Sequence, residues 1–318
     1  MKLLQLMTLA LLSTIAPTYT QWAPVTNGAT APVIGMQMSQ LSVGNAQNIW
    51  SSWQHPFEQH SEVAQWNNTT NKWVANEELK DLPSIIDISA TTERNTVLLL
   101  SSHDDASLQA MIEAQPGADE ALKAQGTIDA LKNNSLLLPQ QLLVWNGTQL
   151  IPTNISNSVA TSIDAFSKNN IAINSVSPGL NGSLNATSPA NSAFNYLNST
   201  NAVISVQAGS NGFYYLEYLP DQTGLQIRSS DTVYYTLPNI SPEAVLYWNI
   251  SNKSIWIVLD EAGTVSINKI DKTTKNETTL PAVPGEISRN NAAKILFSTG
   301  YDDTAWALSN DGTMYRFQ

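Results

Sequence analysis

Two carboxylates are the residues of this sequence whose placement could support catalysis. Asp87 and Asp164 occupy matching positions in the segments S-I-I-D-I-S and T-S-I-D-A-F, on what we expect to be strands that line a central channel. A pair of carboxylates roughly 5–10 Å apart can hydrolyse a glycosidic bond. Inner carboxylates more often bind backbone N–H groups or water, because a buried polar group needs a hydrogen-bond partner. Glycosidase or lyase chemistry is therefore the third of the functions kept open below.

Histidine supplies little to metal or hydrolase chemistry. His55, Glu58 and His60 lie close together in H-P-F-E-Q-H, but this spacing matches no zinc signature, and Pro56 favours an extended loop. His103 is the remaining histidine, and the sequence holds no G-x-S-x-G motif for a serine hydrolase. We therefore expect no metal, no cofactor and no enzymatic activity.

Aromatic residues are better represented, with 9 Trp and 10 Tyr. An aromatic face can stack on the apolar side of a sugar ring, while Asn, Asp and backbone groups bind the hydroxyls. Most aromatic residues at recurring strand positions are core residues, and we expect Trp256 and Trp306 to be buried because apolar residues flank them. Polar neighbours follow Trp53, so this indole is expected to be exposed. The same exposure is expected of four tyrosines, Tyr214, Tyr215, Tyr234 and Tyr235.

The charge balance argues against two classes of partner. The formal net charge is −11, and the four arginines, Arg94, Arg228, Arg289 and Arg316, are dispersed. Nucleic acids and anionic membranes both require clustered Lys and Arg. We expect neither as a partner.

The N-terminus has the pattern of a secretory signal peptide over residues 1–20, with Lys2, an apolar run from Leu3 to Ile15 and a small-residue exit. The apolar run is too short to favour a membrane anchor, so no transmembrane segment is expected. Absence of cysteine is compatible with secretion, because a chain of this length can bury enough apolar surface without disulfides. N-x-S/T sequons add support for a secreted, extracellular eukaryotic glycoprotein. They are Asn67, Asn68, Asn133, Asn146, Asn154, Asn181, Asn185, Asn198, Asn239, Asn249, Asn252 and Asn276.

A repeated pattern of short strands predicts the fold. In the last stretch, Ile295–Phe317, apolar or alternating runs flank Asp311-Gly312, a strong hairpin signal because a tight turn requires positive φ. Weaker copies of this pattern occur upstream at a spacing typical of four-stranded propeller blades. A sandwich or β-helix is the alternative. We predict an all-β fold, a six-bladed β-propeller over 21–318, with units that begin near Leu41, Ile86, Ile163, Val203, Val245 and Ile295.

Three irregular regions complete this prediction. The segment around Trp22–Val25 is expected to pair beside Thr313–Phe317, so that N- and C-terminal strands close one blade and hide two open edges. Residues 104–138 are rich in Ala, Leu, Glu and Lys and predict a small helical insertion. Residues 175–191 are dominated by Ser, Asn, Gly and Pro and predict a long loop.

The last unit resembles the tectonin (tachylectin-type) repeat of carbohydrate-binding propellers. The resemblance lies in Ala305-Trp306-Ala307-Leu308, Asp311-Gly312-Thr313 and Met314-Tyr315-Arg316-Phe317, and the first and fifth units carry it in part. The fungal fucose-specific lectin also has a matching number of units, but its repeated Arg and Glu are absent here. This resemblance implies sugar binding between neighbouring blades, and the candidate ligand-binding residues are Trp53, Asn310, Asp311, Tyr214 and Tyr234.

Three functions from different classes remain open. The first is a glycan-binding lectin, with cell-wall or cell-surface glycans as partners. The second is a secreted interaction or structural propeller that binds another protein and no sugar. The third is the glycosidase or lyase named above. An enzyme requires one pocket with paired carboxylates of raised pKa, whereas an interaction module requires a broad exposed apolar patch.

Overall fold

The computed structural model describes residues 21–54, 61–80, 82, 85–102, 140–154, 159–176, 183–187, 195–196, 203–229, 232–290 and 294–317. The signal-peptide segment, the 104–138 insertion and the histidines lie outside these residues. In the described part, strands are accompanied only by two short 3₁₀ helices, η1 (Glu77–Leu79) and η5 (Pro242–Ala244). No helix of the described residues is long and apolar enough to cross a membrane.

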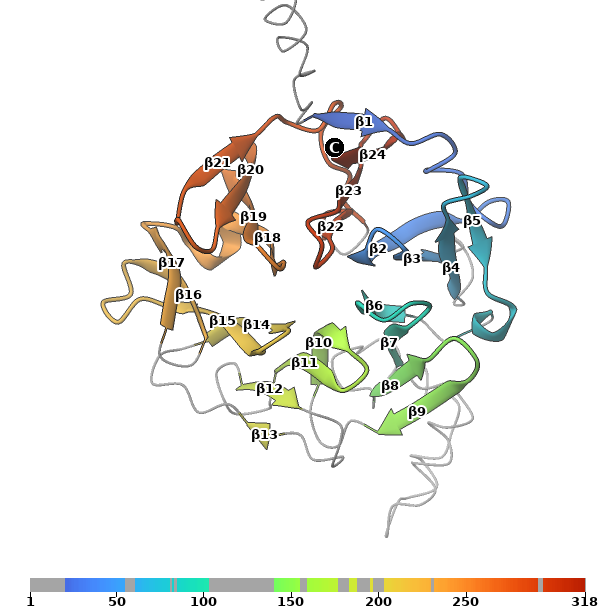
Figure 1. Cartoon of the computed structure of the whole chain (residues 1–318), viewed down its shortest axis with the longest axis horizontal. Coiled ribbons are helices and arrows are strands. Elements are labelled where there is room, and N and C mark those ends of the chain that lie inside the picture. The colour runs from blue at the N-terminus through green and yellow to red at the C-terminus, as the bar shows by residue number, and fades with distance from the viewer. Residues whose placement is uncertain are drawn as a thin grey trace, which may run out of the picture.

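The described strands form six four-stranded antiparallel sheets. We call these sheets blades 1 to 6 in the order in which their inner strands occur, and they surround a common axis in a β-propeller (Figure 1). The prediction of an all-β propeller is confirmed. The strands of blades 1 to 3 are β2 (Gln37–Asn45), β3 (Asn48–Gln54), β4 (Ser61–Asn67), β5 (Lys72–Ala75), β6 (Ile85–Ala90), β7 (Val97–Ser102), β8 (Gln140–Trp145), β9 (Leu150–Asn154), β10 (Val159–Ser167), β11 (Asn170–Val176), β12 (Ser183–Thr187) and β13 (Asn195–Tyr196). Those of blades 4 to 6 are β14 (Val203–Gly209), β15 (Gly212–Tyr218), β16 (Gly224–Ser229), β17 (Thr232–Pro238), β18 (Val245–Ile250), β19 (Ser254–Glu261), β20 (Thr264–Asp271), β21 (Glu277–Leu280), β22 (Phe297–Thr299), β23 (Ala305–Leu308), β24 (Met314–Phe317) and β1 (Trp22–Pro24).

Blade 6 is built from both ends of the chain. The strand order is β1-β24-β23-β22, and Trp22 pairs with Phe317 while Pro24 pairs with Tyr315. The backbone N–H of Val25 continues this ladder by donating to Met314 at 2.8 Å. Figure 1 shows β1 in blue beside the red β24. The predicted pairing of the N-terminal strand with the last strand is therefore confirmed.

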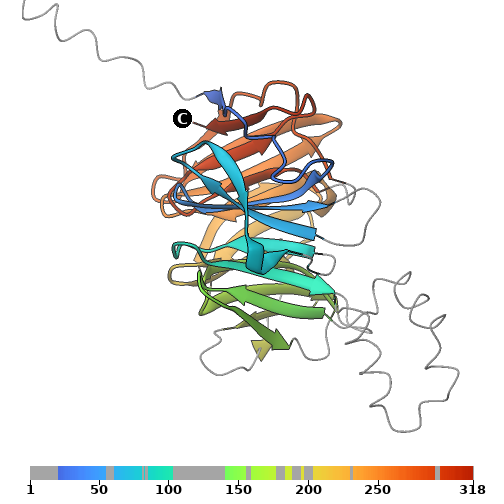
Figure 2. The same cartoon turned by 90° about the vertical axis from the view of Figure 1, so that its right-hand side faces the viewer.

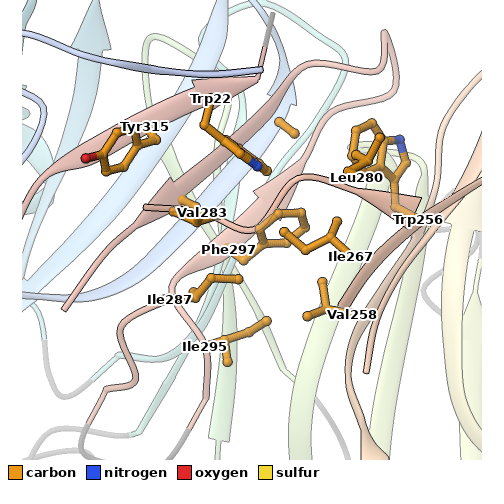
Figure 3. Packing of buried hydrophobic residues seen from close by; sticks show 12 residues of the cluster. Trp22, Trp256, Val258, Ile267, Leu280, Val283, Ile287, Ile295, Phe297 and Tyr315 are labelled. Carbon is orange, nitrogen blue, oxygen red and sulfur yellow. The ribbon is translucent and has the colours of Figure 1, made fainter. Parts of the chain in front are cut away.

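Apolar faces of neighbouring blades pack against each other and make the core. Between blades 5 and 6, Trp22, Trp256 and Phe297 share one cluster of buried side chains (Figure 3). Trp256 and Trp306 are 0% and 1% exposed, as expected from their apolar neighbours. Each blade buries both faces in this way, so the ring is held together mainly by apolar contact between blades.

One predicted loop contains a strand. Ser183–Thr187 forms β12, which pairs with β11 on one side and β13 on the other, although 175–191 was predicted as a long loop. Ser, Asn and Gly have a low strand propensity, but pairing on both sides outweighs that propensity in a sheet. The prediction was wrong for these residues and for Ser175 and Val176, which belong to β11.

Candidate functional site

Polar side chains of the inner strands tie each blade to the next. The hydroxyl of Ser298 accepts from the backbone N–H of Val43 at 2.9 Å, and the hydroxyl of Ser42 accepts from that of Ala90 at 2.8 Å. Further around the ring, the hydroxyl of Ser89 accepts from the backbone N–H of Ala165 at 2.9 Å, and the carboxylate of Asp164 accepts from that of Ala208 at 2.7 Å. On an inner strand, the residue whose side chain accepts comes directly before the residue whose backbone N–H donates to the neighbouring blade, as Ser42 comes before Val43. These acceptors therefore lie at matching positions along the inner strands.

Asp164 is the charged member of this series, where the preceding blades have serine. The amide of Gln207, oriented with its NH₂ group toward Asp164, donates to the two carboxylate oxygens at 2.8 and 3.1 Å. Burial raises the pKa of Asp164 to about 7, and the nearby Asp87 adds to this rise while the Ala208 N–H opposes it. With its amide turned round, the Gln207 side-chain oxygen can instead accept a hydrogen bond from the O–H of the neutral carboxyl, since an amide can donate or accept.

Asp87 and Lys294 lie in the same central channel as Asp164, but toward the end of the channel where the inner strands begin. The backbone N–H of Ile163 donates to one oxygen of Asp87 at 2.8 Å, and Lys294 Nζ lies 3.5 Å from the other. Burial raises the pKa of Asp87, whereas Lys294 lowers it. Beside this pair Gln40 Nε2 donates to the carbonyl of Ile86, but Gln40 Oε1 is buried with no hydrogen-bond partner in the described part of the chain. A buried acceptor of this kind is costly unless water or a ligand satisfies it.

Two aromatic rings close the channel at the other end. Phe166 lies near the end of β10, the inner strand of blade 3, and Tyr301 comes shortly after β22, the inner strand of blade 6. Blades 3 and 6 face each other across the axis (Figure 1). Their ring centroids are 4.8 Å apart in an edge-to-face arrangement. Backbone bonds hold both residues, because Thr92 N–H donates to Phe166 and Tyr301 N–H donates to Gly44, each at 2.9 Å. The channel is therefore a pocket with an aromatic floor rather than an open pore.

This axial pocket has a volume of about 380 Å³. Its lining combines the aromatic floor with carboxylates, amides and hydroxyls, including those of Asp87, Asp164 and Gln207. Pockets of roughly 300–1,000 Å³ with a few convergent polar groups are typical of small-ligand sites. Among the described residues no group of three or more His, Asp or Glu is placed to hold a metal ion.

The predicted glycan site near Trp53 is not formed. Trp53 is 2% exposed, its ring packs edge-to-face with Trp73, and its Nε1–H donates to Ser51 Oγ at 2.6 Å. The polar residues that follow it in sequence do not matter, because the indole turns into the core between blades. Trp53 cannot offer a stacking face, and the prediction of its exposure was wrong.

Asn310 and Asp311 are exposed, as a turn requires, but their polar groups are used locally. Asp311 accepts from Ser309 and, at 2.8 Å, from the backbone N–H of Thr313, which lowers its pKa. The backbone N–H of Asn310 donates to Glu286 at 3.0 Å. These contacts are those of a structural turn.

Tyr214 and Tyr234 are brought together by the fold, with ring centroids 5.3 Å apart. Tyr214 is 5% exposed, contrary to the expected exposure, because it packs in the apolar cluster between blades 4 and 5 with Trp248 and Ile257. Lys275 Nζ lies 4.7 Å from the centre of the half-buried Tyr234 ring, and Lys272 Nζ lies 5.8 Å from that of Tyr214. These cation–π contacts occupy ring faces that a sugar would need.

The pH dependence of stability should report on Asp164. Its raised pKa means that the folded protein binds a proton that the unfolded chain releases, so stability falls as pH rises from about 4 to about 7. Between pH 5 and pH 8 we expect a loss of roughly 2–3 kcal/mol in the free energy of unfolding from this group. Asp164→Asn keeps an acceptor for Ala208 and should remove that part of the pH dependence. Urea unfolding of both proteins at several pH values measures this, and equal pH profiles would contradict it.

Comparison with known proteins leaves the family open. No family model and no curated protein matches the chain. Solved structures with similar overall shape include a prolyl endopeptidase, with 10% identity and a TM-score of 0.48 over 86% of this chain, and TolB from Acinetobacter baumannii, with 8% identity and a TM-score of 0.44 over 81%. An oligogalacturonate lyase from Vibrio parahaemolyticus gives 10% identity and a TM-score of 0.47 over 89% of this chain and 76% of its own. This chain spans 38% of the prolyl endopeptidase and 59% of TolB. At these values the similarity carries no argument about function.

Proposed function

We propose that this chain is a secreted, six-bladed β-propeller lectin that binds a terminal sugar of a glycan in its axial pocket. The axial pocket carries the proposal, because it joins an aromatic floor to carboxylates and amides in about 380 Å³. This placement replaces the crevice between blades that the resemblance to tectonin repeats implied.

Each part of the pocket suits one part of a sugar ring. Phe166 and Tyr301 supply an apolar surface for the C–H side of a pyranose. Gln40 Oε1 has no partner among the described residues and can accept from a hydroxyl, as can the oxygens of Asp87. Lys294, with a half-exposed side chain, is a donor at the mouth. A single sugar bound this way is expected to have a Kd near millimolar, so avidity would require several copies.

Glycan binding is tested by an array on the wild-type protein, followed by calorimetry with the best sugar. Asp87→Asn preserves an acceptor for Ile163, and Lys294→Met removes the donor at the mouth. Both variants should weaken binding by about tenfold or more, which is about 1.4 kcal/mol or more. The matched control is Asp311→Ala, a change in the exposed turn that should leave affinity unchanged. Binding unaffected by both pocket variants would reject the axial pocket as the site.

An interaction module is the second candidate, favoured by exposed apolar residues in the segment that links β1 to β2. Ile34 is 98% exposed and Val33 is 41% exposed. This segment precedes the start of the inner strand β2, at the end of the propeller where Asp87 and Lys294 lie. Silence of the folded protein across the glycan array would favour this second function.

A further inference from the structure

The direction of the strands divides the loops of this propeller between two faces. Within each antiparallel blade the turn from first to second strand and the turn from third to fourth strand lie at the same end. We call this end the turn face, and Phe166 and Tyr301 close the channel on it. The turn from second to third strand and the links between blades lie at the opposite end, which we call the link face. Figure 2 shows the two ends of the strands in side view.

Most sequons whose side chains the structure describes lie in turns of the turn face. Asn67 stands at the β4–β5 turn, Asn146 at the β8–β9 turn, Asn252 at the β18–β19 turn and Asn276 at the β20–β21 turn. All four are exposed or half-exposed. Asn239 is also exposed, but it follows the outermost strand β17 and lies at the rim of the link face.

Side-chain contacts separate two of these asparagines, Asn67 and Asn146, from two other sequons. Asn146 Oδ1 accepts from the Thr148 hydroxyl at 2.9 Å and from the Thr148 N–H at 3.0 Å, and Asn67 Oδ1 accepts from the Thr69 N–H at 2.9 Å. These bonds use the amide oxygen and not the amide nitrogen, which is the atom that carries an N-linked glycan. In contrast, Asn249 Nδ2 donates to the carbonyl of Thr299 at 2.7 Å, and Asn68 Nδ2 donates to that of Ala46 at 2.9 Å.

We infer that the turn face is the glycosylated face, with N-glycans on Asn67, Asn146, Asn252 and Asn276. Asn68 and Asn249 remain unmodified, since the amide nitrogen of each is held against a backbone carbonyl, beside which a glycan would have to be accommodated. Glycans on the closed end cover that end and leave the link face, with the mouth of the axial pocket, open to a macromolecular ligand. This inference concerns covalent modification and does not depend on what the pocket binds.

Site mapping of the full chain, secreted from a eukaryotic host, tests the inference. Enzymatic removal of N-glycans in heavy-oxygen water converts each modified Asn to a labelled Asp, which peptide mass spectrometry locates. Label is expected on the four asparagines of the turn face and not on Asn68 or Asn249. Label on Asn249, or none on the four, would overturn the inference.

Matched variants of one turn supply an independent readout. Thr148→Ala destroys the sequon of Asn146, whereas Thr148→Ser keeps both the sequon and a hydroxyl for Asn146 Oδ1. The Ala variant should lose one glycan on gel electrophoresis, and the Ser variant should keep it. Since Thr148 lies in an exposed turn, both variants are expected to fold. Equal migration of wild type and Thr148→Ala would show that Asn146 is not modified.

Discussion

Trp22→Ala is expected to lower the free energy of unfolding by about 3–5 kcal/mol, the usual cost of removing a buried tryptophan. Trp22 is 7% exposed, and its ring centroid lies 5.3 Å from that of Phe317 and 6.0 Å from that of Phe297. Its Nε1–H also donates to the carbonyl of Pro281 at 2.8 Å. The substitution therefore leaves a cavity where blades 5 and 6 meet the closing strand (Figure 3).

Urea unfolding measures this loss, and Ile34→Ala is the matched control from the same N-terminal segment. Ile34 is 98% exposed, so its truncation should change the free energy of unfolding by less than about 0.5 kcal/mol. A loss below about 1 kcal/mol for Trp22→Ala would mean that β1 contributes little to the closed ring.

Glu217→Ala is the second substitution with a large expected effect, again about 3–5 kcal/mol, because it removes the fully buried carboxylate of an ion pair. Glu217 is 0% exposed, and its Oε1 lies 2.7 Å from Arg228 Nε and 2.6 Å from Gln226 Nε2. The Arg228 Nε contact lacks the geometry of a hydrogen bond, so we treat it as an ion pair. Arg228 also lies over the Tyr215 ring, at 6.0 Å from its centre.

A double-mutant cycle separates the ion pair from the space that its side chains fill. Glu217→Leu with Arg228→Leu should cost less than the sum of the single changes, because no charge is then left buried. Glu77→Ala is the exposed control, since Glu77 pairs with Lys80 through side chains that are 80% and 53% exposed. Additive losses at Glu217 and Arg228 would show that the pair does not act as a unit.

The fold was predictable because strand and turn signals recur along the chain. Asp311-Gly312 marks a hairpin, and Gly312 has the expected positive φ of 82°. The closing strand was predictable because the last unit had one strand too few and Trp22–Val25 resembled an outer strand. In contrast, β12 has no strand signal of its own, since its polar sequence is held by pairing with β11 and β13.

The axial pocket was predictable only in its carboxylates. The matching positions of Asp87 and Asp164 indicated the inner strands, and the structure places both in the lining of the pocket. Lys294 and Gln40 could not be assigned to the pocket from the sequence. They belong to other blades than Asp87, and only the packing of the folded ring brings them beside it. Phe166 could have been found by comparing the inner strands. It is an aromatic residue at the strand end, at the position that corresponds to Gly44 in blade 1 and Thr91 in blade 2.

Exposure of single aromatic residues was the weakest prediction. Trp53 has polar neighbours in sequence and Tyr214 lies in the aromatic run Phe213–Tyr215, yet the side chains of Trp53 and Tyr214 are both buried. Alternation along a strand says which residues share a face, but in a propeller both faces of most blades are covered by neighbouring blades. Sequence polarity next to a residue therefore does not decide its burial here.

The pairing of β1 with β24 also sets a limit on when this protein can reach its native state. The bond between Trp22 and Pro281 joins residues 259 positions apart, and the ladder of β1 requires Phe317. During synthesis β1 must wait for β24, and chains with such distant contacts fold slowly. Until β24 is made, β1 and the outer edge of β23 have no partner, and an unpaired strand edge can recruit another chain. Truncation of only the last few residues is thus expected to favour aggregation of newly made chains over simple loss of one strand.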